Sequence, residues 1–426
     1  MLLAFLLSLF GFIFLGVPIA FSLVMTAVIL MLLSSGSVTP AILSQSMVRG
    51  IDSFPIMAIP FFMLAGEIMN VGGISKRIVY FSKALVGHVT GGLGYVAVIA
   101  SMIFAGVSGS AVADTSAIGS ILLPIMDMEG YDRKKSTALV ASAGCIGPII
   151  PPSIPMILFG VIGGVSIVKL FLGGIIPGVL IGIGLMIIWH SHAKKHNYQS
   201  SEKATLKSVL KSAREAFWAL ILPIIILGGI ILGIYTPTEA AVIAVVYAFV
   251  VSTFVYKEFK PHHWLNVLVT SAKTTAVVML VCGAATSVGY LITTAQIPVL
   301  LANTILQLAH NNVFLVMLLI NILLLLVGCV MDLTPALLIL GPILLPIAIS
   351  YGLDPVYFGV VMCVNLCIGL ITPPVGTVLY VGCGLSKLSM AELTKPILGF
   401  IGVMVVVLML ITYIPSLVTF IPNLVK

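Results

Sequence analysis

The stretches Ile121–Ile125 and Ile343–Ile347 both read ILLPI, and they begin 222 positions apart (121 and 343) in a chain of 426 residues. The same offset joins other identical residues. These pairs are Gly106 with Gly328, Gly130 with Gly352, Asp132 with Asp354, Cys145-Ile146-Gly147 with Cys367-Ile368-Gly369, and Pro151-Pro152 with Pro373-Pro374. Apolar segments resemble one another by composition alone, but a constant register that includes Gly, Pro, Asp and Cys indicates a duplication. Duplicated hydrophobic segments interrupted by Gly and Pro are typical of secondary transporters and point to their binding sites.

The composition is that of an integral membrane protein. The chain is 60% hydrophobic and 8% charged, and it can hold roughly a dozen spans of about 20 residues each. We therefore expect an all-α membrane fold. Met1–Leu33 has no basic stretch before its apolar residues, so we interpret it as retained helices and not as a signal peptide. The six cysteines lie in apolar runs without ligand spacing, which argues against disulfides and against a transition metal.

The basic residues predict the topology. They cluster at 76–77, 133–135, 194–195, 203–214 and 257–260, and by the positive-inside rule these loops are cytoplasmic. Loops that alternate with membrane spans are poor sites for nucleic acid, whereas lipid is an expected partner. The counterpart of basic loop 130–135 in the second copy is 352–355, which has no basic residue. The two copies are therefore predicted to have opposite orientations, as in an inverted-topology repeat.

Two local patterns predict helices near the middle of the chain. In Ser201–Phe217, apolar and basic residues fall on different helical faces, which predicts an amphipathic helix on the inner leaflet that links the two halves. Attachment of a partner subunit is the alternative use of this helix. Glu239 follows Tyr235-Thr236-Pro237-Thr238 and is predicted to cap the helix that begins there.

Each copy contains two interruptions, a polar tip and a Gly…Pro-Pro break, which we expect to bind ions. Interrupted membrane helices free carbonyl groups that must be buried in protein or line a cavity. Together with hydroxyl groups, such carbonyls form an oxygen cage suited to sodium, so we predict one sodium site per repeat and no other cofactor. The predicted ligands are Ser108, Gly109, Ser110, Gly147, Ile150 and Pro151 in the first repeat, and Gly328, Asp332, Thr334, Asn365, Gly369 and Thr372 in the second. The alternative is that Gly and Pro only kink the helices for packing.

The same breaks place half-helix N-termini in the membrane, and these suit an anionic substrate. An ionised Asp at mid-membrane depth costs roughly 2.5–3.5 kcal/mol on insertion scales, so Asp114 and Asp332 are expected to bind ions or to stabilise a tip. The predicted substrate-binding residues are Arg49, Ser110, Asp114, Pro152 and Pro374. Arg49 has a structural alternative, which is an ion pair with Asp52.

Enzyme functions fit the sequence less well. Gly106-Val107-Ser108-Gly109 matches the GxSG pattern of an intramembrane serine protease, but that chemistry needs a histidine at membrane depth to activate the serine. The histidines lie near segment ends or in polar stretches. A GxGD signature and a Walker A loop are both missing. We therefore expect no enzymatic activity.

Several motifs over almost the whole chain resemble the large membrane subunit of tripartite ATP-independent periplasmic (TRAP) transporters. They are Asp52–Pro55, Ile59–Gly66, Ser108–Ser110, Pro148–Ser153, Tyr235–Ala241 and Ile371–Gly376. The resemblance implies an inverted-repeat elevator fold, like that of the ion transporter superfamily, with two re-entrant hairpins and two broken helices. It also implies sodium-driven import of an organic acid across the bacterial inner membrane. The second tip, Cys329–Asp332, departs from the serine-rich pattern of the first, so the ligands of the second ion site are less certain.

The resemblance also implies partners and a division of the chain. A periplasmic binding protein delivers the substrate, and a small four-helix membrane subunit is expected as a separate chain. Sialic acid and C4-dicarboxylates are the expected substrate types. The expected segments are scaffold helices of repeat 1 (1–87), a transport hairpin and broken helix (88–165), a scaffold span with the amphipathic connecting helix (166–216), scaffold helices of repeat 2 (217–297), a second transport hairpin and broken helix (298–385) and a C-terminal span (386–426).

Two other functions stay open at this point. The chain could be a self-sufficient sodium–carboxylate symporter of the same elevator class that needs no binding protein. It could also be a membrane scaffold without transport activity. Uptake by the chain alone would identify the symporter.

Overall fold

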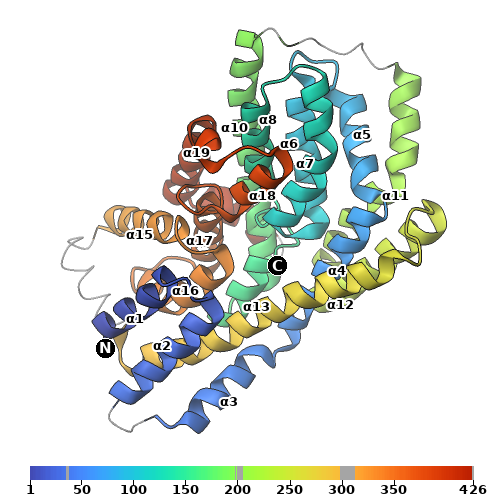
Figure 1. Cartoon of the computed structure of the whole chain (residues 1–426). Helices are drawn as coiled ribbons and strands as arrows, with labels where there is room; N and C mark the ends of the chain where they lie inside the picture. The colour runs from blue at the N-terminus through green and yellow to red at the C-terminus, as the bar shows by residue number, and fades with distance from the viewer. Residues whose placement is uncertain (35–37, 197, 199–204, 298–311, 425–426) are drawn as a thin grey trace.

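A computed structural model describes residues 1–34, 38–196, 198, 205–297 and 312–424, and the regular structure in these ranges is helical (Figure 1). Parts of the predicted connecting helix and of segment 298–385 lie outside the described residues. Eight helices in the described part are long and apolar enough to cross a membrane. The helices of the first half are α1 Leu2–Phe14, α2 Ile19–Leu33, α3 Pro40–Ile51, η1 Phe54–Met57, α4 Ala58–Val71, α5 Ile74–Val86, α6 Gly92–Ser108, α7 Ala111–Met128, α8 Arg133–Gly144, α9 Ile154–Gly163 and α10 Ile167–His196. Those of the second half are α11 Leu206–Ile231, α12 Pro237–Val250, η2 Val251–Val255, α13 His263–Thr294, α15 Val313–Gly328, α16 Leu333–Ser350, α17 Pro355–Gly369, α18 Thr377–Ser386, α19 Met390–Tyr413 and α20 Ser416–Leu424.

The duplication seen in the sequence recurs in the helix boundaries. Both α7 and α16 have 18 residues, and their ends differ by the same 222 positions that separate the two ILLPI stretches. The helices α9 and α18 have 10 residues each and differ by almost the same offset. The order of helix, tip, helix and interrupted helix is therefore repeated in the two halves.

All four predicted interruptions are present. The helix α6 ends before Gly109 and α7 starts after Ser110, while residues 329–332 separate α15 from α16. Residues 145–153 separate α8 from α9, and residues 370–376 separate α17 from α18. Pro at the start of a helix and Gly at its end explain several of these boundaries, because Pro lacks an N–H and Gly tolerates positive φ.

The interrupted helices of both halves pack together with their neighbours into a central body (α6–α10 and α15–α20). The helices α7 and α8 contact α18, and α8 also contacts α19, while α9 contacts α16 and α17. The helix α10 packs against α6, α17, α19 and α20. The assignment of segment 166–216 to the scaffold stays a prediction.

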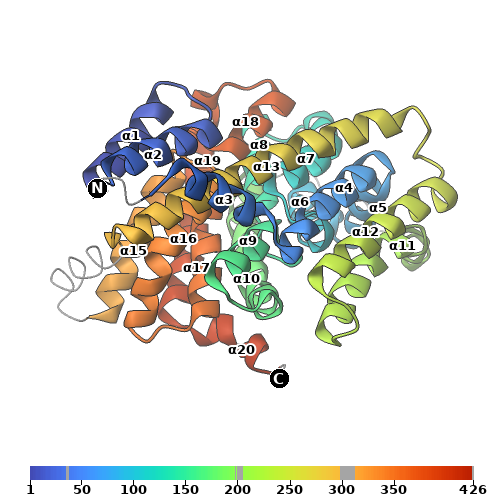
Figure 2. The same cartoon turned by 90° about the horizontal axis from the view of Figure 1, so that it is seen from below.

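The long helix α13 crosses the molecule diagonally and forms the flank next to the central body (Figures 1 and 2). It packs against α2, α3, α4 and α16. The helix α4 in turn packs against α12, and α5 packs against α11. These contacts join helices from the first and second halves into a flanking layer, which we call the outer layer (α2–α5 and α11–α13).

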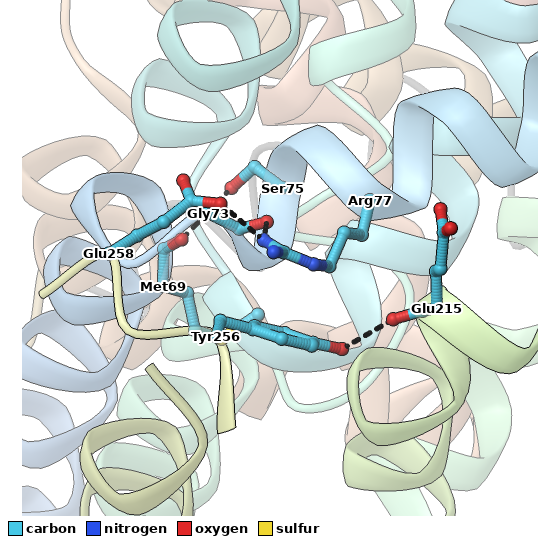
Figure 3. Close-up of polar contacts among 7 residues, drawn as sticks. All are labelled: Met69, Gly73, Ser75, Arg77, Glu215, Tyr256 and Glu258. Carbon is cyan, nitrogen blue, oxygen red and sulfur yellow. Dashed lines mark hydrogen bonds and ion pairs between the residues drawn. The ribbon is translucent and has the colours of Figure 1, made fainter. Parts of the chain in front are cut away.

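A polar joint fastens three parts of the outer layer (Figure 3). Arg77 Nη1 donates to Glu258 Oε1 at 2.7 Å and to the Gly73 carbonyl at 2.9 Å. The guanidinium carbon of Arg77 lies 3.7 Å from the centroid of the Tyr256 ring, a cation–π distance. The Tyr256 hydroxyl donates to the carbonyl of Glu215 at 3.0 Å. The start of α5, the segment after η2 and helix α11 are thereby held together.

The connecting helix differs from its prediction. The predicted amphipathic helix ends at Phe217 and is separate from the span that follows it. In the structure, α11 is continuous from Leu206 to Ile231. The cause is local, because Arg214-Glu215-Ala216-Phe217-Trp218 contains no Gly or Pro that would end a helix. The amphipathic residues are thus the first turns of a membrane helix.

Candidate functional site

The first tip is built by a short turn between α6 and α7. Gly109 has φ +61°, which lets the chain reverse direction directly after Ser108. The Ser110 side chain caps α7 by accepting from Ala113 N–H at 3.4 Å. The Ser108 hydroxyl donates to Oδ1 of Asp114. Two hydroxyl groups, of Ser108 and Ser110, and the carboxylate of Asp114 therefore lie close together at the start of α7.

The second tip uses a different set of side chains in the same place of the repeat. Asp332 directly precedes α16, just as Ser110 directly precedes α7. The Thr377 hydroxyl, at the start of α18, donates to Asp332 Oδ1 at 3.0 Å. The first tip thus holds a serine where the second holds a carboxylate.

Each tip packs against the helix break of its own repeat. A Cβ added at Gly109 would lie 2.6 Å from the carbonyl oxygen of Pro152, and one at Gly369 would lie 2.6 Å from Cα of Gly328. Such close backbone contact is possible only because these positions lack side chains. The backbone oxygens of the tips and the breaks are therefore brought near one another.

Both tips open into one cavity of about 410 Å³. Its wall from the central body includes Ser108–Ala113, Pro148, Ile154, Asp332, Leu333, Thr334 and Leu370. The opposite wall comes from α4 and α13 of the outer layer. That wall contributes the polar residues Glu67, Asn70, Ser271 and Thr274.

The cavity is acidic. Its lining carries the carboxyl groups of Glu67 and Asp332, and the part of the chain that the structure describes places no Lys, Arg or His side chain in it. The helices α7 and α16 begin at the cavity, at Ala111 and Leu333. Helix N-termini carry a partial positive charge of roughly +0.5 and free N–H groups. An anion in this cavity would meet helix N-termini, and no basic side chain of the described residues.

Some of the predicted site residues meet in this cavity and others lie elsewhere. Those that line it are Ser108, Gly109, Ser110, Asp332 and Thr334. Those in the breaks or at the helix ends beside them are Gly147, Ile150, Pro151, Pro152, Gly328, Gly369, Thr372 and Pro374. Asp114 is fully buried behind the first tip and does not line the cavity.

Two further predicted residues, Asn365 and Arg49, do not line the cavity. Asn365 is buried, and its amide donates to Asn321 Oδ1 at 2.8 Å, while Asn321 donates to Thr412 at 3.0 Å. These bonds tie α17 to α15 and α19. Arg49 is exposed near the end of α3, outside the lining, and it forms no ion pair with Asp52 in the described residues.

The polar residues that α4 and α13 contribute to the cavity are not among the residues predicted from the sequence. Glu67 and Asn70 lie in the last turns of α4, three residues apart, and therefore on one helical face. Ser271 and Thr274 have the same spacing on α13. This spacing within apolar helices is the signal that could have identified them.

The fold and the cavity define the class of the protein. Interrupted membrane helices from two repeated halves that meet at one polar cavity are the architecture of secondary transporters. The sequence matches the family "Tripartite ATP-independent periplasmic transporter, DctM component" over residues 6–417. The chain belongs to this family.

Individual relatives agree with that assignment. The chain is 50% identical over 414 residues to a TRAP transporter large permease protein of Haemophilus influenzae, covering 97% of each sequence. It is 45% identical to the 2,3-diketo-L-gulonate TRAP transporter large permease protein of Escherichia coli, covering 98% of this chain and 97% of the relative. The solved YdaH transporter of Alcanivorax borkumensis has a similar fold, with a TM-score of 0.64 at 14% identity and 86% of each chain covered.

The family membership decides three of the predictions. The chain is a multi-pass protein of the inner membrane. It is a transporter permease and not an enzyme, so the protease reading of Gly106–Gly109 is wrong. As the DctM component, it is one part of a tripartite system.

Proposed function

We propose that the chain imports an organic acid anion together with sodium, as the membrane permease of a three-component system. The observation that carries the proposal is the single cavity of about 410 Å³ into which both tips open. Its walls offer hydroxyl groups, carboxylates and helix N-termini. These groups can hold sodium ions and an anion side by side.

The charge of the cavity favours coupling between cation and anion. An anion that enters a site lined by Glu67 and Asp332 is repelled unless cations enter with it. The predicted sodium ligands at the two tips are next to the cavity or line it. With two sodium ions and one monoanion, one net positive charge moves inward, which releases about 2.3 kcal/mol per 100 mV of membrane potential.

The arrangement of the repeats supports an elevator mechanism. The hairpins and interrupted helices of both halves pack into one central body, while α4 and α13 contribute the facing wall. Movement of the central body past this wall would carry the cavity residues of the tips across the membrane. If the two repeats are inverted as predicted, an exchange of their conformations converts an outward-facing state into an inward-facing one.

Partners and substrate follow from the family. A periplasmic binding protein would deliver the acid, and a small four-helix subunit would complete the membrane part. The E. coli relative named for 2,3-diketo-L-gulonate favours a sugar-derived acid, and sialic acid and C4-dicarboxylates remain proposed substrates. The exposed apolar side chains of the outer layer, such as Trp218 and Phe254, suit contact with lipid or with the small subunit.

Reconstitution tests the proposal. Proteoliposomes would contain the chain and the small subunit encoded with it, with the cognate binding protein outside and a panel of labelled sialic acid, C4-dicarboxylates and sugar acids. We expect uptake of one acid class that requires an inward sodium gradient and rises with an inside-negative potential. Vesicles with choline in place of sodium are the control.

The same assay separates the alternatives. Uptake by the chain without the binding protein and the small subunit would identify a self-sufficient symporter. Uptake that is equal in sodium and choline would disprove sodium coupling. No uptake of any organic acid by the complete system would contradict the proposed function.

A further inference from the structure

The carboxylate of Asp114 is the least satisfied charged group near the site. It lies in the first turn of α7 and is completely buried. Oδ1 accepts the Ser108 hydroxyl, but Oδ2 has no hydrogen-bond partner in the described part of the chain. None of the ion pairs between described residues includes Asp114.

The unpartnered oxygen faces the first helix break. A Cβ added at Gly147 would collide with Asp114 Oδ2, so this oxygen lies directly over the backbone of Gly147. Cys145, Ile149 and Pro152 in the same break are also buried. Asp114 Oδ2 is therefore enclosed between the first tip and the break, and Asp114 is not among the residues that line the cavity.

An ionised carboxylate in this position needs a positive partner. Burial of an ionised group without a counter-charge is strongly unfavourable. The N-terminus of α7 offers only about half an elementary charge, and one serine hydroxyl bonds only one of the two oxygens. Carboxylate and carbonyl oxygens are the preferred ligands of hard cations, and both are present at this place.

The second repeat has no equivalent group. The position that corresponds to Asp114 is Ala336, which is buried. The carboxylate of the second tip, Asp332, instead lines the cavity and is bonded by Thr377. A cation at the first tip would thus lie next to a carboxylate outside the cavity lining. The carboxylate of the second tip, Asp332, lies in the lining, where the substrate can also contact it.

We propose that Asp114 Oδ2 is the anionic ligand of the sodium ion at the first tip. The proposal rests on the sodium coupling of the proposed function. Of the two roles expected for Asp114 from the sequence, ion binding and substrate binding, it retains the first.

Thermal unfolding of the purified chain tests this proposal without any transport measurement. Sodium chloride would replace choline chloride at constant ionic strength, with no organic acid present. A ligand that binds only the folded state stabilises it by RT ln(1 + [L]/Kd), so the unfolding midpoint of the wild type should rise once sodium exceeds its Kd and then increase with the logarithm of the sodium concentration. We expect Asp114→Asn to need about tenfold or more sodium for the same rise, which corresponds to the loss of about 1.4 kcal/mol of binding free energy.

Asp132→Asn is the matched control. It makes the same chemical change in the same repeat, at the exposed cap of α8, where Asn also caps well. Its sodium response should equal that of the wild type. An Asp114→Asn protein with the wild-type sodium response would overturn the assignment of Asp114 and leave sodium coupling intact. A wild type that sodium does not stabilise beyond choline would overturn both.

Should Asp114→Asn not fold, density maps of the wild type in sodium and in choline replace it. We expect a peak beside Asp114 Oδ2 in sodium only. A sodium-dependent peak at the second tip with none beside Asp114 would refute the proposal.

Discussion

At the scale of single residues, the site depends on positions without side chains. Gly328 at the end of α15 and Gly369 at the end of α17 touch through their backbones, and this contact brings the second tip onto the second break. The first tip reaches its own break through Gly109. Both contacts control where the backbone oxygens of the predicted ion sites lie.

The change Gly369→Ala tests this contact. The new methyl group would lie 2.6–2.7 Å from backbone atoms of Gly328, which cannot yield as a flexible side chain could. We expect a loss of about 1–3 kcal/mol in folding free energy, together with weaker sodium-dependent uptake. Gly384→Ala in α18 is the control, because no atom lies within 4 Å of its added methyl group. Equal unfolding midpoints and uptake for both variants would contradict the role of the contact.

Residue types at the tips were predictable from the sequence, but their neighbours were not. Ser108, Gly109 and Asp332 stand out because polar residues and Gly interrupt apolar runs. Arg49 has the right charge for an acid, yet its position relative to the cavity depends on how α3 packs on α13, which no local pattern encodes. Glu67 lies near the end of a span, where polar residues usually mark only the membrane boundary.

At the scale of elements, capping explains where two membrane helices begin. Thr236 accepts from Glu239 N–H at 3.3 Å, and Glu239 Oε2 accepts from Thr236 N–H at 2.7 Å. This reciprocal capping box confirms the predicted role of Glu239. Ser389 and Glu392 form a second box at the start of α19.

Thr236→Ala should therefore destabilise the start of α12. Loss of a hydroxyl cap typically costs about 1 kcal/mol, so we expect a lower unfolding midpoint of the purified protein. Thr236→Ser retains the hydroxyl and should keep the wild-type midpoint. The prediction is wrong if the alanine and serine variants unfold at the same temperature.

The interruptions were predictable because Gly and Pro recur at one offset in both halves. The continuity of α11 was not, since helical periodicity shows which face is apolar but not whether the next turn leaves the membrane surface.

At the scale of the whole molecule, the cavity lies between the central body and the outer layer. A Cβ added at Gly66 of α4 would lie 3.8 Å from Cβ of Ser108 on α6. This separation matches the Cβ–Cβ distance of about 3.8 Å in disulfides. Cysteines placed at Gly66 and Ser108 can therefore detect movement of the central body relative to the outer layer.

The double variant Gly66→Cys, Ser108→Cys should form a disulfide under oxidising conditions. Ser108 is a predicted sodium ligand, so the readout is cross-linking and not uptake. If the central body moves relative to the outer layer, part of the population holds the two cysteines apart, and cross-linking under brief oxidation should be incomplete, measured by gel shift on proteoliposomes. Each single variant is a control for the native cysteines and should show no such shift. Immediate and complete cross-linking of the whole population would contradict the elevator mechanism.

The polar joint in Figure 3 would restrain movement of the central body relative to the outer layer. Arg77 pins the first turn of α5 to the segment after η2, and Tyr256 pins that segment to α11. The other end of α5 leads into α6 of the central body through residues 87–91, where Gly91 has φ +73°. With one end anchored, α5 would act as a tether in an elevator movement, and the length and bending of this link would limit how far the first hairpin moves.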